Sequence, residues 1–278
     1  MPRTITGRSL SVVSLRKQTK EEKPMYGKTI RLRRLFPDPR RRLFSVPLDH
    51  AVSMGPIDGL EELAPLAREL QEGGADLLIV SKGAARELAP VLAPRTLLGI
   101  HVSASTSLGP TSHHKRLVGT AAEAVALGAD VLSVQVNFGV AEEGNMLTDL
   151  GTAADQCGQL GLPLLCMAYV KKADGGTPDD LRHAARAAAD LGADIVKTSY
   201  PGSAEEFAKL CRTTPVPVLI GGGVRMDDEA SILRIIEESL RSGGAGICIG
   251  RNLFQRPPVG ALARRIASLL HGGSDLGT

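Results

Sequence analysis

The chain has 278 residues, of which 43% are hydrophobic and 3% aromatic, and its net charge is +3. This length suits one large domain, and because Trp is absent, small aliphatic side chains must form most of its core. The four cysteines include no CxxC pair, which predicts reduced thiols in a cytoplasmic protein and argues against a disulfide framework. No apolar stretch approaches the length of a membrane span, so we expect no membrane partner.

Positive charge is concentrated at the start of the chain. Residues 1–42 contain 13 Lys or Arg against 3 acidic residues, whereas the remainder contains 20 against 27. A basic arm can bind nucleic acid, but no recognition motif accompanies this one, and we expect no nucleic-acid partner. Over 30–36 the arginines alternate with apolar residues. We therefore expect a basic extension, residues 1–27, that covers the floor of the fold or a subunit contact, and a flexible tail at 272–278.

Short apolar runs alternate with helical patterns along the rest of the chain. Amphipathic spacing predicts helices over 60–72, 121–127, 178–191 and 227–241. Strands are expected in the apolar runs near residues 43–48, 77–81, 97–101, 131–136, 163–168, 194–198, 216–220 and 246–249.

A Gly-Ala-Asp phrase recurs at 74–76, 128–130 and 192–194, with a glycine-rich variant at 243–246. Each copy follows a helical pattern and precedes an apolar run, as expected where a glycine ends a helix in the left-handed conformation. Eight strand–helix units with apolar strands predict an α/β fold, a (β/α)8 TIM barrel over residues 28–271. A doubly wound open sheet is the alternative, although no GxGxxG follows the first expected strand.

Polar residues stand where the expected strands end, and in a TIM barrel these positions face the active site. The set is Asp49, His50, Ser81, Lys82, His101, Ser103, Gln135, Asn137, Tyr169, Lys197, Thr198, Ser199 and Tyr200.

Lys197 is the most informative of them, because it lies in the apolar run Ile195-Val196-Lys197-Thr198. Burial of a lysine is costly and lowers its pKa, and a neutral amine condenses with ketones to form a Schiff base. The helix-facing side of a barrel strand must be apolar, so we expect Lys197 to point inward. Three alternatives remain at this stage: a structural ion pair at Lys197, Lys82 as the nucleophile, or Lys82 as a second ammonium that lowers the pKa of Lys197.

Schiff-base chemistry also needs groups that give and take protons, and Asp49 and Tyr169 are the candidates. His50 and His101 are weaker candidates that suit orientation of the substrate, as do Lys82 and Ser199. Asp49, His50 and His101 could in principle bind zinc, but adjacent strand residues point to opposite faces and no HExxH occurs. We therefore expect neither a metal nor any other cofactor.

Two glycine turns follow the last two expected strands, at Gly221-Gly222-Gly223 and Gly250-Arg251. Glycines let backbone amides approach an oxyanion, and TIM barrels bind phosphate after these strands. Arg225 and Arg251 could add charged hydrogen bonds. The sequence thus predicts a phosphate site, with two simple tight turns as the alternative.

These motifs resemble those of a known family. Residues 46–56, VPLDHAVSMGP, are similar to the first-strand motif of the archaeal-type class I fructose-bisphosphate aldolases, which share a family with the 2-amino-3,7-dideoxy-D-threo-hept-6-ulosonate synthases. The segments 194–200, DIVKTSY, and 249–255, IGRNLFQ, resemble the Schiff-base strand and the last strand of the family. The resemblance implies an imine on Lys197, proton donation by Tyr169, acid–base assistance by Asp49, a phosphorylated substrate, and a homo-oligomer that is often ring-like.

Some positions depart from the fructose-bisphosphate aldolase pattern. Met167 replaces the tryptophan of those enzymes, Gln135 replaces a histidine, and Lys171 replaces the arginine of a Tyr-Pro-Arg-Gly segment. Within the family the chain resembles the branch of 2-amino-4,5-dihydroxy-6-oxo-7-(phosphooxy)heptanoate synthases of secondary metabolism. That resemblance implies joining of dihydroxyacetone phosphate to aspartate 4-semialdehyde, with fructose-bisphosphate aldolase, amino-heptulosonate synthase and an imine-free barrel isomerase as alternatives.

Overall fold

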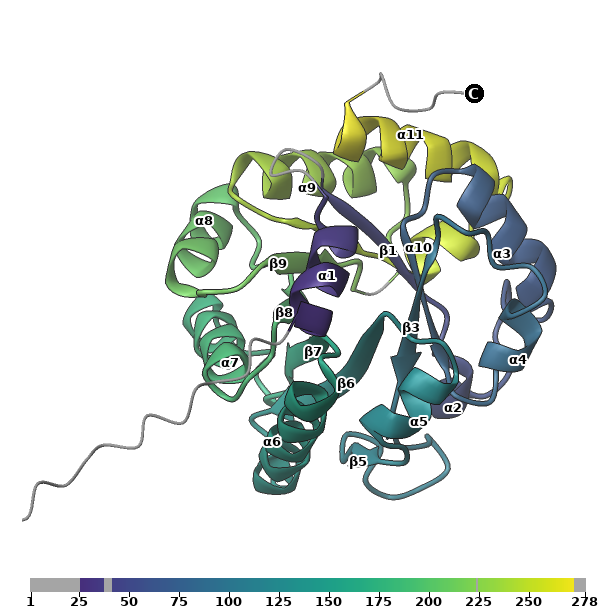
Figure 1. Cartoon of the computed structure of the whole chain (residues 1–278). Helices are drawn as coiled ribbons and strands as arrows, with labels where there is room; N and C mark the ends of the chain where they lie inside the picture. The colour runs from purple at the N-terminus through teal and green to yellow at the C-terminus, as the bar shows by residue number, and fades with distance from the viewer. Residues whose placement is uncertain (1–25, 38–41, 224, 273–278) are drawn as a thin grey trace, which may run out of the picture.

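The computed structural model describes residues 26–37, 42–223 and 225–272. Eight parallel strands form a closed barrel in the ring order β1-β10-β9-β8-β7-β6-β3-β2 (Figure 1). The predicted TIM barrel is therefore confirmed, and the open sheet is excluded. Its strands are β1 (Leu43–Pro47), β2 (Leu77–Ser81), β3 (Leu97–His101), β6 (Val131–Phe138), β7 (Leu164–Val170), β8 (Ile195–Ser199), β9 (Val218–Gly221) and β10 (Gly246–Cys248).

Helices surround the barrel (Figure 1). Side chains of Thr120, Thr177, Ser203 and Asp228 cap the amino-terminal ends of four of them, which fixes where these helices begin. The long helices that cover the strands are α3 (Leu63–Glu72), α6 (Glu143–Leu160), α7 (Pro178–Asp190), α8 (Ala204–Thr213), α9 (Glu229–Arg241) and α11 (Val259–His271), and the shorter ones are α4 (Ala85–Leu88) and α5 (Ala121–Ala126).

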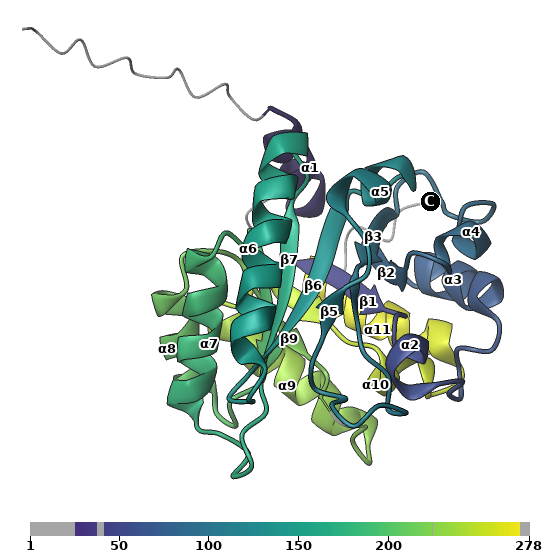
Figure 2. The ribbon, with the colours of Figure 1, turned by 90° about the horizontal axis from the view of Figure 1, so that it is seen from below.

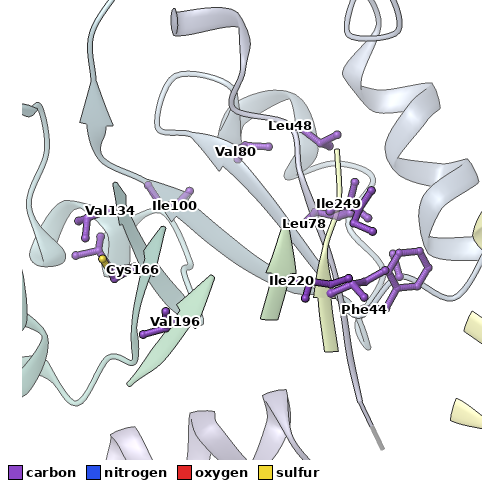
Figure 3. Packing of buried hydrophobic residues seen from close by; sticks show 14 of the residues in the cluster. Phe44, Leu48, Leu78, Val80, Ile100, Val134, Cys166, Val196, Ile220 and Ile249 are labelled. Atoms are coloured by element: carbon purple, nitrogen blue, oxygen red, sulfur yellow. The ribbon is translucent and has the colours of Figure 1, made fainter. Parts of the chain in front are cut away.

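The strands separate two apolar cores because successive side chains point to opposite faces. Outward-facing residues such as Phe44, Leu78 and Val196 pack beneath the helices (Figure 3). Inward-facing residues such as Leu43 and Leu77 fill the interior of the barrel. Polar side chains can therefore enter the barrel at one end without disturbing the larger core under the helices.

Helix α1 (Tyr26–Leu35) covers the amino-terminal end of the barrel (Figures 1 and 2). Its Leu35 is 2% exposed and joins the interior cluster with Leu43, Leu77 and Ile195, while Leu32 packs against the same cluster. The described part of the basic segment thus covers the floor of the fold. Most of the expected extension (1–25) and of the expected tail (273–278) lies outside the described residues.

The aspartate of each Gly-Ala-Asp phrase holds the start of a strand. Its carboxylate accepts a backbone hydrogen bond from the strand that precedes it in the chain, which fixes the strands at the end of the barrel that α1 covers. The pairs are Asp76 with Phe44 N at 2.8 Å, Asp130 with Leu98 N at 3.1 Å, and Asp194 with Leu164 N at 2.8 Å.

The opposite end of the barrel carries short elements. Helices α2 (Ala51–Met54) and α10 (Arg251–Phe254) follow β1 and β10, and lie toward the end opposite α1 (Figure 2). A two-stranded antiparallel sheet, β4 (Ser103–Ala104) and β5 (Arg116–Leu117), follows β3 and was not predicted from the sequence. Its connecting loop reaches α2, where Ser107 N donates to Ser53 O at 2.9 Å. This loop borders the cavity described next.

Candidate active site

A cavity of about 490 Å³ opens at the carboxyl-terminal ends of the strands. Asp49 is the one acidic residue among those that line it, whereas several lysines and Arg251 line it as well. Such a charge distribution favours an anionic ligand. The predicted site residues in its lining are Asp49, His50, His101, Tyr169, Lys197, Ser199, Gly222, Gly223, Gly250 and Arg251.

Lys197 points into the barrel from β8. It is 5% exposed, and its Nζ lies 3.9 Å from the Sδ of Met167 on β7 and 5.7 Å from the centre of the Tyr169 ring. Ile195 joins the interior cluster while Val196 joins the outer core, as the alternation of the strand predicts. Gly221, another predicted site residue, also lies beside this side chain. A Cβ on Gly221 would lie 3.1 Å from Lys197 Cε.

The pKa of Lys197 differs from the sequence expectation. Burial lowers it, but charge interactions with Cys248, Tyr169 and Asp49 together raise it above the ordinary lysine value. Burial raises the pKa of the Cys248 thiol and of the Tyr169 phenol, so Asp49 is the member of this group that carries charge at neutral pH. The expectation of a lowered pKa is thus wrong for the unliganded site, where the pKa of Lys197 is raised and its amine is protonated at neutral pH.

Asp49 follows β1 and lies among cationic and imidazole groups. Its Oδ2 is 3.5 Å from His101 Nε2, and its Oδ1 is 3.8 Å from His50 Nδ1. Burial raises the pKa of Asp49, but His101, His50 and Lys197 outweigh it, so the pKa is lowered and the carboxylate is ionised. Burial lowers the pKa of His50 to about 4 and also lowers that of His101, so both imidazoles are neutral near pH 7.

Tyr169 lies beside Lys197 on the neighbouring strand. It lies on β7 next to β8, and its hydroxyl lies 3.5 Å from the position of a Cβ on Gly221. Burial raises the pKa of its phenol, while the charge of Lys197 acts in the opposite direction. The phenol therefore keeps its proton at neutral pH beside the amine of Lys197.

The two glycine turns form a close-packed backbone surface at the ends of β9 and β10. A Cβ on Gly250 would lie 2.6 Å from His50 Cε1 and 2.9 Å from Pro47 O, so a larger residue does not fit. Arg251 Nη2 donates to Gly223 O at 3.0 Å, and Asn252 Nδ2 donates to Gly222 O at 2.8 Å. The site thus combines accessible backbone with a guanidinium, which are the groups that bind phosphate.

The structure places Lys82, Arg225 and Tyr200 outside this cavity. Lys82 Nζ lies 3.1 Å from Glu123 Oε1 on α5, and Lys82 does not line the cavity. The strand ends at Ser81, so the next side chain turns toward the surrounding helices. Lys82 is therefore paired beside α5 and lies outside the cavity that contains Lys197. Arg225 likewise borders a separate surface pocket of about 320 Å³ beside α9 and α11.

Sequence reasoning also missed a residue of the cavity. Lys115 lies in the loop between β4 and β5, is 7% exposed, and donates from Nζ to Ser53 Oγ at 2.6 Å. No strand end or periodic pattern marks this position in the sequence. The loop is held by Asn137, whose Nδ2 donates to His113 O at 2.6 Å. Within the described ranges no group of three or more His, Cys, Asp or Glu residues is arranged to hold a metal ion.

Comparison with known families identifies this arrangement. The model of the DeoC/LacD family aldolases matches residues 43–256, which span the whole barrel from β1 to α10. The chain belongs to the DeoC/LacD aldolase family. It is therefore a carbon–carbon lyase, and its cavity at the strand ends is the place for aldolase chemistry. No helix in the described part of this aldolase is long and apolar enough to cross a membrane.

Individual relatives agree with this assignment. The aldolase is 39% identical over 255 residues to a 2-amino-4,5-dihydroxy-6-oxo-7-(phosphonooxy)heptanoate synthase of Streptomyces griseus, covering 91% of this chain and 93% of the relative. It is 37% identical over 251 residues to a 2-amino-3,7-dideoxy-D-threo-hept-6-ulosonate synthase of Halobacterium salinarum, covering 90% and 93%.

Solved aldolase structures support the same family assignment. An archaeal fructose 1,6-bisphosphate aldolase superposes with a TM-score of 0.81 at 27% identity, covering 88% of this chain and all of the other. A Schiff-base-forming fructose-1,6-bisphosphate aldolase, studied through its reaction intermediates, superposes with a TM-score of 0.79 at 26% identity, covering 88% and 100%. The family resemblance inferred from the motifs is thus confirmed.

Proposed function

We propose that this protein is a class I aldolase in which Lys197 forms an imine with the ketone of dihydroxyacetone phosphate. The observation that carries the proposal is a buried lysine on β8, directed into the mouth of the barrel beside Tyr169 and Asp49. An amine in this position can attack a carbonyl carbon, and the two neighbours supply the proton transfers that imine formation needs.

Lys197 must lose a proton before it can attack, because its amine is protonated in the unliganded site. Asp49 is the nearby carboxylate that accepts this proton. Attack of the neutral amine on the ketone gives a carbinolamine, and Tyr169 donates the proton with which hydroxide leaves as water. The iminium then withdraws electrons, and the Tyr169 phenolate left by the previous step removes a proton from the adjacent carbon, which gives an enamine.

The enamine carbon attacks the aldehyde carbon of the acceptor and forms the new carbon–carbon bond. The aldehyde oxygen takes up a proton, and water then adds to the iminium and releases the product with regeneration of Lys197. The phosphate of the donor binds to the backbone of Gly222, Gly223 and Gly250 with the guanidinium of Arg251. Anchoring the phosphate there keeps the ketone within reach of β8.

Aspartate 4-semialdehyde is the acceptor that we propose, which makes the product an amino-dihydroxy-oxo-heptanoate phosphate for antibiotic-type secondary metabolism. The name of the Streptomyces griseus relative supports this choice, as does Met167 in place of a bulky tryptophan. Cleavage of fructose 1,6-bisphosphate is the second candidate, supported by the structural neighbours. A single barrel domain over 28–271, a cytoplasmic location and a homo-oligomer complete the proposal.

Reduction with borohydride in the presence of dihydroxyacetone phosphate tests the first step. We expect a stable adduct on the peptide that contains Lys197, and none in Lys197→Ala, which should keep its fold because a small residue fits the cavity. An adduct on Lys82, or no adduct with active wild-type protein, would show that an imine on Lys197 is not formed. Rates measured with aspartate 4-semialdehyde and with fructose 1,6-bisphosphate then distinguish the two candidate reactions.

A further inference from the structure

Lys115 is a buried cation without an anionic partner of its own. Its side chain lines the active-site cavity, and its Nζ is held by the neutral hydroxyl of Ser53. Among the described residues, no carboxylate lies within ion-pair distance of this ammonium. Burial lowers the pKa of Lys115, Asp49 raises it from a distance, and Lys171 lowers it further. A buried ammonium with one hydroxyl contact destabilises the empty site unless a ligand supplies the anion.

The loop that carries Lys115 reaches from the end of β3 to α2, which follows β1. The phosphate turns follow β9 and β10, and β10 pairs with β1. Lys115, Lys197 and Arg251 line the same cavity of about 490 Å³. The cavity can therefore hold a ligand that carries a second anionic group in addition to a phosphate.

We propose that Lys115 binds the carboxylate of the acceptor aldehyde and so selects anionic acceptors over neutral ones. This inference rests on the proposed class I aldolase reaction, because the acceptor approaches the enamine only after the phosphorylated donor is bound to Lys197. The donor phosphate occupies the glycine turns, so a second anion on the acceptor must be neutralised elsewhere in the cavity. Lys115 provides that charge, and the hydroxyl of Ser53 orients it.

Two other roles for Lys115 are less consistent with its surroundings. A structural lysine in a protein interior is usually paired with a carboxylate, and here the contact is a hydroxyl. A catalytic lysine would have to reach the reacting carbon, but Lys197 already occupies the barrel interior beside Tyr169. Charge recognition at the edge of the cavity accounts for both the burial and the missing anion.

Comparison of two acceptors in Lys115→Met tests the proposal. The acceptors are aspartate 4-semialdehyde and butanal, which has the same chain length without the charges. We expect kcat/KM for the semialdehyde to fall on the order of 30-fold or more, as for loss of a hydrogen bond to a charged group, while the value for butanal stays within about threefold. Lys115→Arg should retain most of the preference. Lys82→Met, which removes a lysine outside the cavity, is the matched control.

Borohydride trapping separates this inference from the proposed function. Lys115→Met should still give the Lys197 adduct with dihydroxyacetone phosphate at close to the wild-type yield, and its melting temperature should not fall. An equal loss of kcat/KM for both acceptors in Lys115→Met would overturn the role of Lys115 but not the imine mechanism. The same holds if the wild-type enzyme shows no preference for the carboxylated aldehyde. Absence of the Lys197 adduct in wild-type protein would instead overturn the imine mechanism. Should Lys115→Met not fold, Lys115→Gln takes its place with the same expectations.

Discussion

Lys28 Nζ lies 2.9 Å from Asp194 Oδ2, and this ion pair joins helix α1, at the amino-terminal end of the barrel, to the strand that carries Lys197. Asp194 directly precedes β8, and its carboxylate also accepts the backbone N–H of Leu164 at the start of β7. Helix α1 thereby fixes the amino-terminal ends of the two strands that carry Tyr169 and Lys197. Arg34, 3.6 Å from Asp130, makes a similar contact in front of β6.

Asp194→Ala should lower the free energy of unfolding by about 2–4 kcal/mol. The change leaves the Leu164 amide and the Lys28 ammonium without their acceptor in a poorly solvated place. Urea denaturation at pH 7 measures the effect. Asp190→Ala, which breaks an exposed pair with Arg186, is the control and should change stability by less than about 1 kcal/mol. An equal loss of unfolding free energy in both variants would show that the contacts of Asp194 with Lys28 and Leu164 do not stabilise the barrel.

Tyr169→Phe should lower kcat by about 10²–10⁴-fold, because it removes a positioned proton donor and retains the ring. The KM for dihydroxyacetone phosphate should change little, since the phosphate turns are untouched. Steady-state rates of both substrates provide the measurement. Tyr200→Phe is the matched control, because the Tyr200 hydroxyl donates to Glu238 at 2.6 Å and lies outside the cavity. A normal kcat in Tyr169→Phe would assign proton donation to another group.

Gly250→Ala should raise the KM for dihydroxyacetone phosphate by about tenfold or more. A Cβ at this position would lie 2.6 Å from the His50 ring and 2.9 Å from Pro47 O, so the turn must shift away from the phosphate. Gly83→Ala serves as the comparison, because nothing lies within 4 Å of a Cβ there. Unchanged KM values in both variants would show that the turn after β10 does not contact the donor.

Stability should fall as the pH is lowered from about 6.5 to about 4, because burial lowers the pKa of His50 to about 4. An unfolded histidine binds a proton below its pKa of about 6.5, whereas folded His50 binds one only near pH 4, so acid favours the unfolded chain. The loss of stability begins below about pH 6.5, is complete below about pH 4 and amounts to at most about 3 kcal/mol. Urea denaturation at pH 7 and pH 5 should show a smaller pH effect in His50→Gln than in wild-type protein.

The strands could be predicted from the sequence because a barrel strand must be apolar on its helix-facing side over its whole length. Alternation also placed Lys197 correctly, since Ile195 and Lys197 share one face of β8. Helix α1 could not be predicted, because its mean hydropathy is low and contacts such as Lys28 with Asp194 stabilise it. Those contacts join residues far apart in the chain, so the local sequence pattern around α1 does not indicate them.

The errors in the predicted site have a common physical origin. The sequence indicated that Lys197 is buried, which lowers its pKa, but not that Cys248, Tyr169 and Asp49 come close enough to raise it. It placed Lys82 at a strand end without showing that Glu123 on α5 draws it out of the barrel. Lys115 was missed because a loop residue has no periodic neighbours. Each case depends on a partner from another unit of the barrel.

The Gly-Ala-Asp aspartates and helix α1 secure the strands at one end, while the proposed substrate site lies at the other. Together with the proposed role of Lys115, this division predicts that mutations in the segment between β4 and β5 alter the choice of aldehyde without lowering stability. Evolution, or directed redesign, can therefore exchange that segment to create new condensation products on an unchanged foundation.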